Sequence, residues 1–114
     1  MSQITGDALR GHLETLVLSA LEKGDAHGFE ILKRLRDAAS GALQLKEGSL
    51  YPALYRMESS GWIKGVWEAS DSTRRGPRRR TYRLTAKGRR RLDEARGEFK
   101  QFVAVIGTIL GIAS

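Results

Sequence analysis

The hydrophobic residues of the N-terminal half recur at helical spacing. Between residues 9 and 22 the apolar positions follow i, i+3, i+4, i+7 and i+8, which is one face of a helix: Leu13, Leu16, Val17, Ala20 and Leu21. A second helix is predicted over residues 28–39, and it buries Ile31, Leu32 and Leu35. We expect residues 1–8 to form a frayed arm, residues 25–28 a tight connection and residues 43–45 a short strand.

A third helix is predicted from Ser49 to about Ser60, with Pro52 in its first turn, where a missing backbone N–H costs little. Its inner face is apolar: Leu50, Ala53, Leu54 and Met57. The opposite face differs from the Glu/Lys mixture of an ordinary solvated helix, because it carries aromatic, hydroxyl and guanidinium groups. These outward residues, with Tyr51 at the flank, are the predicted contacts with a binding partner: Ser49, Tyr51, Pro52, Tyr55 and Arg56.

The next segment is predicted to be a two-stranded hairpin. Residues 62–69 are rich in Trp, Ile and Val and predict a strand, and residues 78–84 predict its antiparallel partner. Residues 70–77 form the connection, in which Gly76-Pro77 is a turn signal. Trp67 and Tyr82 are expected to pair across the two strands.

Thr85 is expected to cap a last helix that continues toward the C-terminus. Its apolar residues obey a seven-residue repeat for about three heptads, which is typical of a helix that packs on a second helix. They are the predicted dimer interface: Leu92, Ala95, Phe99, Phe102, Val103, Ile106, Ile109 and Leu110, followed by Ala113. The fold class is therefore mainly α with a small β-hairpin (α+β): a winged helix-turn-helix domain at residues 9–84 and a dimerisation helix at residues 85–113.

The charge of the chain is concentrated in one stretch. The chain has a net charge of +7, and ten of the eighteen residues from Arg74 to Arg91 are Lys or Arg with no acidic residue among them, so the rest sums to −3. A local basic surface indicates a polyanionic partner. The arginines predicted to bind DNA phosphates or the minor groove are those of the wing: Arg74, Arg75, Arg78, Arg79 and Arg80.

The sequence gives little support to an enzyme, a metal-binding protein, a secreted protein or a membrane-spanning protein. The two histidines, His12 and His27, have no obvious catalytic partner, and no phosphate-loop motif is present, so neither an enzyme nor a cofactor is predicted. The absence of cysteine excludes disulfides and thiolate metal sites and suits a reducing cytoplasm. The N-terminus lacks the apolar core of a signal peptide, and the apolar segment at residues 102–113 is shorter than the roughly twenty residues that span a bilayer.

Four stretches of this chain resemble the PadR-like transcriptional regulators in their short form: His27-Gly28-Phe29-Glu30-Ile31, Glu47-Gly48-Ser49-Leu50-Tyr51-Pro52-Ala53-Leu54, Gly76-Pro77-Arg78-Arg79-Arg80-Thr81-Tyr82 and Arg83-Leu84-Thr85-Ala86-Lys87-Gly88. The resemblance implies a homodimeric, cytoplasmic (nucleoid-associated) transcription factor. Such a protein is usually a repressor that binds a palindromic operator of double-stranded DNA and is released by a small molecule. The segment from Glu47 to Ser60 would then be the recognition helix.

The resemblance also suggests an effector site. Some multidrug-sensing members carry a Trp in the dimerisation helix that stacks on flat ligands, and the aligned position in this chain is Phe99. A phenyl ring also stacks on a small aromatic effector, but with less area and without an N–H donor. We therefore expect a possible effector pocket at Phe99.

Two binding classes compete with a DNA-binding regulator. An RNA- or ribosome-associated basic protein would also attract phosphates, because charge alone does not distinguish DNA from RNA. A peripheral membrane protein would use the apolar C-terminal helix, but the heptad repeat favours a protein partner over lipid, so no membrane partner is predicted. The two-fold symmetry of a helix-mediated dimer suits a DNA palindrome, and this favours DNA over RNA.

Overall fold

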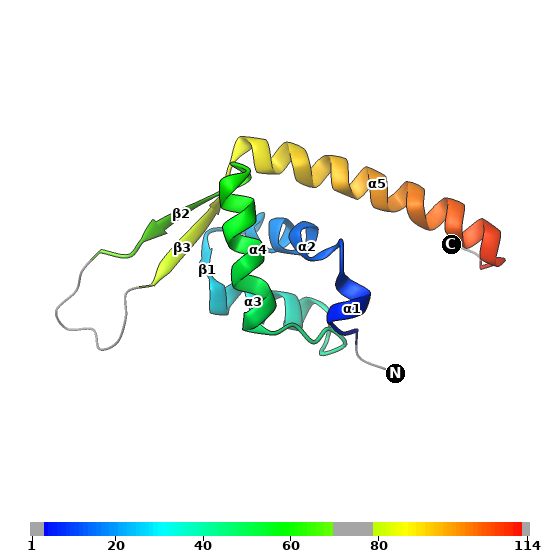
Figure 1. The fold of residues 1–114 in the computed structure, drawn as a ribbon, viewed down its shortest axis with the longest axis horizontal. Coiled ribbons are helices and arrows are strands. Elements are labelled where there is room, and N and C mark those ends of the chain that lie inside the picture. Colours follow the sequence, from blue (N-terminus) through cyan, green and yellow to red (C-terminus); the bar gives the residue numbers. More distant parts are fainter. Residues whose placement is uncertain (1–3, 70–78, 113–114) are drawn as a thin grey trace.

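The computed structural model of the chain describes residues 4–69 and 79–112. Figure 1 shows a helical body from which a hairpin projects on one side and a long helix on the other, within an envelope of 59 × 32 × 21 Å. The elements in chain order are α1 (Gly6–Leu9), α2 (Leu13–Leu21), β1 (Ala26–His27), α3 (Gly28–Ala38), α4 (Glu47–Ser59), β2 (Ile63–Trp67), β3 (Arg80–Leu84) and α5 (Ala86–Leu110).

The core lies between α2, α3 and α4 and is closed by the sheet and the start of α5. The predicted apolar faces of the three helices point into it, including Val17 of α2, Ile31 of α3 and Met57 of α4, all without exposed area. Burial of each large side chain of this kind favours the folded state by about 1.5–3 kcal/mol. This core fixes α4 with its polar and aromatic face turned outward.

The sheet has three strands in the order β1-β3-β2, all antiparallel. The hairpin was predicted, but β1 was not: Ala26 pairs with Tyr82 and His27 with Thr81 inside the segment expected to be only a tight connection. A two-residue strand has no periodicity, so it forms only because β3 supplies its partner. The predicted Trp67–Tyr82 pair is wrong, because Tyr82 lies opposite Gly65 and Trp67 lies opposite Arg80.

The N-terminal region departs from the expected frayed arm and unbroken first helix. Gly11 adopts a φ of +87°, which favours glycine and separates α1 from α2. Ile4 forms an isolated parallel bridge with Leu43, and this bridge is the only β-structure in the predicted strand at residues 43–45. The N-terminal segment is thus tied to the loop before α4.

The helix α5 begins as predicted at a Thr85 cap, whose Oγ1 accepts a hydrogen bond from the Gly88 N–H at 3.0 Å. Gly88 packs directly on the carbonyl oxygen of Trp62, where a Cβ would clash with backbone. Leu92 and Ala95, which we predicted for the dimer interface, are instead buried in the core of their own chain. The domain boundary at residue 85 stays a prediction, although the first turns of α5 clearly belong to the core.

Candidate nucleic-acid interface

The outer face of α4 exposes every residue that the sequence predicted for it. Ser49, Tyr51, Pro52, Tyr55 and Arg56 are all exposed, while the inner face of the same helix is buried. Tyr55 is the most open, with 76% of its surface exposed. An exposed aromatic ring beside hydroxyl and guanidinium groups offers both apolar contact with base methyls and hydrogen bonds to base edges.

Tyr51 is held at the flank of this face. Its hydroxyl lies over Gly28 at the start of α3, where an added Cβ would be only 2.6 Å from the Tyr51 oxygen. Gly28 therefore permits the close approach of α3 and α4 and sets the position of the Tyr51 ring. The ring remains about half exposed, so its outer edge stays available to a ligand.

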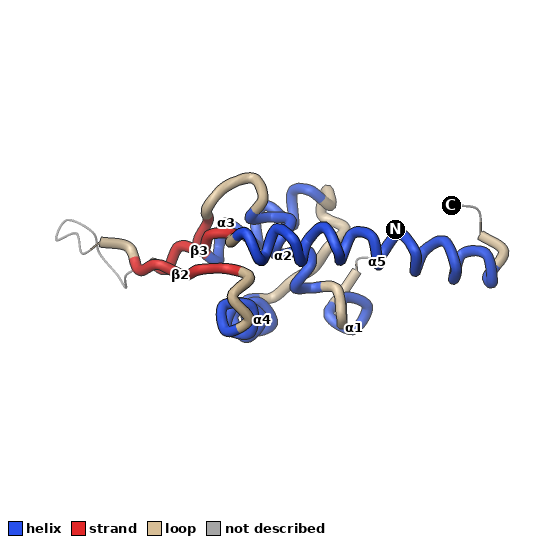
Figure 2. Tube along the Cα trace, turned by 90° about the horizontal axis from the view of Figure 1, so that it is seen from above, coloured by secondary structure: helices blue, strands red, loops and turns tan. Residues whose placement is uncertain are grey.

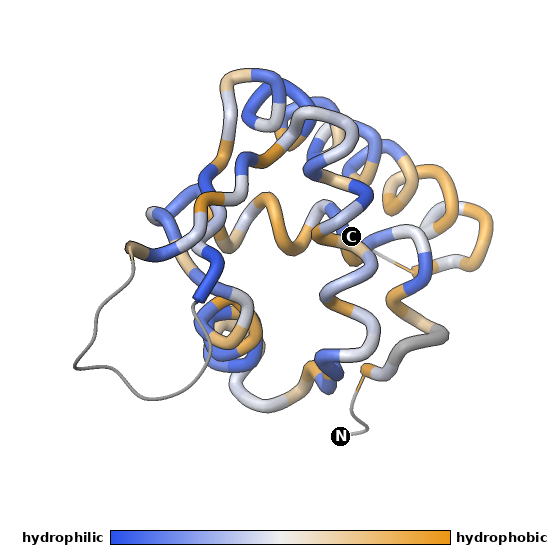
Figure 3. Tube along the Cα trace, turned by 60° about the vertical axis from the view of Figure 1, so that its left-hand side comes forward, coloured by the Kyte–Doolittle hydropathy of each residue, from blue (hydrophilic) through white to orange (hydrophobic). Residues whose placement is uncertain are grey.

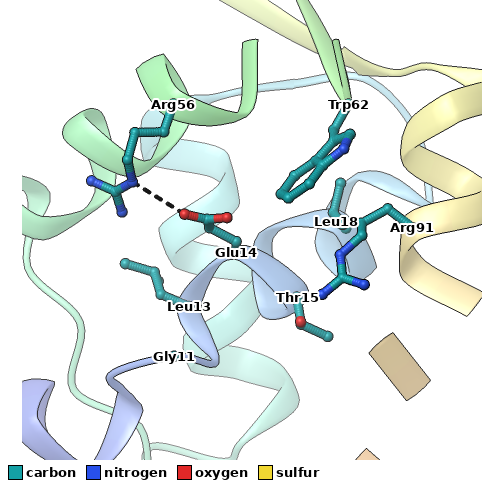
Figure 4. A pocket seen from close by; sticks show the side chains of 8 residues that line it. All are labelled: Gly11, Leu13, Glu14, Thr15, Leu18, Arg56, Trp62 and Arg91. Atoms are coloured by element: carbon teal, nitrogen blue, oxygen red, sulfur yellow. Dashed lines mark hydrogen bonds and ion pairs between the residues drawn. The ribbon is translucent and has the colours of Figure 1, made fainter. Parts of the chain in front are cut away.

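Arg56 lies on the outer face but bends back toward α2. Its Nε donates to Glu14 Oε1 at 3.1 Å, as drawn in Figure 4. The pair borders a small cavity of about 170 Å³. Its lining comes from α2 and the turn before it, from α4 and the connection after it, and from α5 (Figure 4): Gly11, Leu13, Glu14, Thr15, Leu18, Arg56, Trp62 and Arg91. A base contact by Arg56 would require the guanidinium to leave Glu14, a change with a modest cost because the Arg56 side chain is 58% exposed and the Glu14 side chain 34%.

Of the five predicted wing arginines, two lie within the described residues. Arg74, Arg75 and Arg78, together with the predicted loop at residues 70–77, lie outside them. Arg79 is exposed, and its Nη1 lies 3.4 Å from Nε2 of His27. Figure 2 shows the described part of the hairpin extending away from the helices, with α4 alongside its base. This arrangement places a basic hairpin next to the exposed face of α4.

Arg80 is placed differently from its described neighbour Arg79. Its Nε and Nη2 both donate to the Glu58 carboxylate of α4, and its guanidinium lies 5.1 Å from the centre of the Trp67 ring. The hydrogen bond to Glu58 raises the pKa of Arg80 above its usual range. A groove of about 480 Å³ lies here between α4 and the sheet, lined by Tyr51, Tyr55, Glu58, Ser59, Arg80 and Tyr82.

The distal half of α5 presents a surface of the opposite kind. Figure 3 shows this helix changing from hydrophilic near its start to hydrophobic toward its end. The exposed apolar side chains here are Phe99, Phe102, Val103, Val105, Ile106, Ile109, Leu110 and, just beyond the helix, Ile112. Ala113 lies outside the described residues.

The predicted effector residue Phe99 belongs to an aromatic cluster. It stacks on Phe102 with ring centres 6.4 Å apart, and its ring meets the His12 ring edge-on at 5.5 Å. His12 was not predicted as part of any site, because nothing in the sequence relates it to residues 87 positions further on. Phe99 remains half exposed within this cluster.

Neither a metal centre nor a membrane span is found among the described residues. Within residues 4–69 and 79–112 no group of three or more His, Asp or Glu side chains is placed to hold a metal ion. The helices of that same part of the chain include none that is long and apolar enough to cross a membrane.

A three-helix core whose third helix, α4, turns a polar face outward beside a basic hairpin defines a winged helix-turn-helix DNA-binding protein. The family model "Transcriptional regulator PadR-like family" matches residues 17–94. The chain belongs to this family of transcriptional regulators, and the predicted resemblance is confirmed.

Solved structures agree with this assignment. A transcriptional regulator from Clostridium thermocellum is 33% identical with a TM-score of 0.80, and the match covers 90% of this chain and 97% of that one. A PadR family transcription regulator from Clostridium difficile is 37% identical with a TM-score of 0.72, covering 88% and 99%. An uncharacterized protein of Lysinibacillus sphaericus is 29% identical over 104 residues, which are 90% of this chain and 92% of that protein.

Proposed function

We propose that this regulator is a homodimeric repressor that binds a palindromic operator and is released by a small aromatic effector. The observation that carries the proposal is the pairing of two exposed surfaces in one chain, the outer face of α4 and the distal half of α5. The first suits a base-paired groove and the second suits another copy of the same helix. Repression itself rests on the family resemblance alone.

Support for the dimer comes from the width and content of the apolar surface on α5. At 100° per residue its side chains occupy an arc of about 160° of the helix circumference. One row contains Phe99, Val103 and Ile106, and a second row contains Phe102 and Ile109. A surface this apolar is typical of the core of an obligate interface and not of a solvated helix.

Support for a palindromic operator comes from symmetry. A two-fold dimer presents two copies of α4, and such pairs bind half-sites whose centres lie about 34–36 Å apart, one helical turn of DNA. Within each half-site we propose that Ser49, Tyr55 and Arg56 contact base edges. Tyr51 and Pro52 would contact the backbone or a thymine methyl.

Selection of bound sequences from a random duplex pool tests this function directly. We expect an inverted repeat whose half-site centres are about 10 base pairs apart, bound by two chains in sedimentation analysis. A reporter gene placed behind the selected site should lose expression when the protein is supplied. A single, non-repeated site bound by one chain would contradict the dimeric mode. Equal competition by RNA of matched length would contradict DNA specificity itself.

The effector part of the proposal is tested at Phe99. The variant Phe99→Trp offers a larger stacking surface and an indole N–H, so it should bind a flat dye such as acridine orange more tightly in the absence of DNA. Operator affinity without the dye should change little. The matched control is Val105→Trp, which adds the same ring elsewhere on α5. An equal gain in both variants, or in neither, would place any effector site elsewhere.

A further inference from the structure

Arg80 occupies a site built from three elements of the fold. It comes from β3, its guanidinium is hydrogen-bonded through two nitrogens to Glu58 of α4, and it passes over Gly65 of β2. A Cβ at Gly65 would collide with the Arg80 guanidinium, so the missing side chain makes room for it. Trp67 provides an aromatic wall at 5.1 Å. The arginine is therefore enclosed and not projected toward solvent.

At the Trp67–Arg80 pair the hairpin is no longer supported by the third strand of the sheet. The third strand, β1, pairs only with Thr81 and Tyr82 of β3, so the Trp67–Arg80 pair is the first beyond its support. A two-stranded ribbon without a third strand or a helix beneath it is marginally stable in water. Glu58 lies near the end of α4 and provides a charged contact between the helix and the ribbon at the point where the ribbon leaves the body.

We propose that the Glu58–Arg80 pair fixes the orientation of the wing relative to the recognition helix, so that Arg80 is a positioning residue for sequence-specific binding and not a phosphate contact. The inference rests on the DNA-binding function proposed above. It adds how α4 and the wing are held in a fixed orientation relative to each other. Both side chains are less than one third exposed, and a two-point Arg–carboxylate pair fixes an angle as well as a distance.

The neighbouring arginine provides the contrast. Successive residues of an extended strand point to opposite faces, and Arg79 lies on the side of His27, away from Glu58. Within residues 4–69 and 79–112 its side chain is not paired with a carboxylate in the way that Arg80 is, and the Glu68 carboxylate accepts instead from the Arg79 backbone N–H, at 3.2 Å. Arg79 therefore suits a phosphate, whereas a phosphate at Arg80 would first have to displace the Glu58 carboxylate. Two adjacent arginines thus have different roles.

Binding measurements on the full chain separate these roles. Glu58→Gln keeps the shape of the side chain and removes its charge. Both Glu58→Gln and Arg80→Gln should weaken binding to the selected operator about tenfold. Neither should alter the affinity for a scrambled duplex or the salt dependence. The double variant should be no weaker than either single variant. Arg79→Gln should instead weaken both duplexes and lower the salt slope by about 0.9.

The sign of the Glu58→Gln effect is decisive. If the carboxylate only repelled DNA, its removal would strengthen binding to every duplex, and this result would overturn the proposal. A lower salt slope in Arg80→Gln would overturn it as well, because it would make Arg80 a phosphate contact. Glu22→Gln is the matched control, since it removes a carboxylate from another arginine pair, Glu22–Arg96, which joins the end of α2 to α5 and includes no residue of the hairpin.

A direct measurement of wing orientation needs no DNA. The chain has no cysteine, so spin labels can be placed at Ala69→Cys beside the hairpin and Lys33→Cys on α3, both exposed. Labelled chain is mixed with excess unlabelled chain so that only distances within one chain are measured. Glu58→Gln should broaden the distance distribution, while Glu22→Gln should not. An unchanged distribution would refute the inference, whereas a wild-type chain without any preferred sequence would refute the DNA-binding function.

Discussion

The outer face of α4 and the distal half of α5 are both exposed, but they are made of opposite chemistry. The first carries hydroxyl, guanidinium and tyrosine groups that remain hydrated at little cost. The second carries aliphatic and phenyl side chains, of which Ile109 is 74% exposed. Exposure by itself therefore does not identify a partner. The chemistry of each surface is what supports our proposal of nucleic acid for one and a second copy of the chain for the other.

The two surfaces also differ in how strongly each requires its partner. Burial of a large apolar side chain contributes about 1.5–3 kcal/mol, so the distal half of α5 has a strong drive to associate. The face of α4 gains less by burial, through its two tyrosine rings, and depends chiefly on matched hydrogen bonds. Variants on α5 should consequently affect the assembly, whereas variants on α4 should affect the choice of sequence.

The largest effect is expected at the centre of the apolar surface. Ile106→Asp would bury an unpaired charge in the proposed interface, which is strongly unfavourable. The variant should sediment as a monomer, or unfold, and should lose operator binding by more than about a hundredfold because two half-sites no longer act together. Gln101→Asp on the polar side of the same helix is the control. A dimeric Ile106→Asp protein with normal operator affinity would show that this surface does not mediate assembly.

An intermediate effect is expected on α4. Loss of a two-point arginine–guanine contact costs about 1–3 kcal/mol at one base position, so Arg56→Ala should relax the preference at one position in each half-site. Affinities for a panel of single-base operator variants measure this. Because Arg56 is paired with Glu14, Glu14→Gln is a useful companion that frees the guanidinium without removing it. A uniform loss for all sequences in Arg56→Ala would make Arg56 a phosphate contact.

The smallest effect is expected where α5 leaves the body. Arg96 donates two hydrogen bonds to Glu22, at 2.8 and 3.1 Å, and these lower the pKa of the Glu22 carboxyl. A lowered folded-state pKa means that the stabilisation is present above the unfolded-state pKa and disappears as the pH falls through the folded-state value. In Glu22→Gln this loss no longer occurs, so Tm should fall slightly less than in the wild type as the pH is lowered. A fall in Tm identical to that of the wild type would show that the exposed pair contributes nothing.

Much of the fold could be predicted because its elements carry local signals. The helix α4 was found from its apolar face and Pro52, and α5 from Thr85 and its heptads. The strand β1 was missed because two residues have no period and depend on a partner more than fifty positions away. The break at Gly11 was missed because the apolar pattern continues across it, and the backbone geometry rather than the pattern interrupts the helix.

The residues of the candidate site were predicted from the sequence, but the ion pairs that they form were not. Periodicity identified the outward residues of α4, yet it could not show that Arg56 is paired with Glu14. For Arg80 a signal was present: it shares a strand face with Tyr82, whose apolar ring belongs inside, so its side chain should have been expected to face the helices. The distant carboxylate that receives it, Glu58, is identified only by the three-dimensional arrangement.

The packed first turns of α5, beginning with Gly88, fix the direction in which that helix leaves the body. Gly88 rests on the backbone of Trp62 at the base of the hairpin, and the 25-residue helix continues from there to Leu110. At 1.5 Å per residue, a difference of about 10° in that direction would move the far end by about 6 Å. In a dimer joined at the far ends, the same difference changes the distance between two recognition helices. The absence of one methyl group at residue 88 would then help to determine the half-site spacing that the protein can bind.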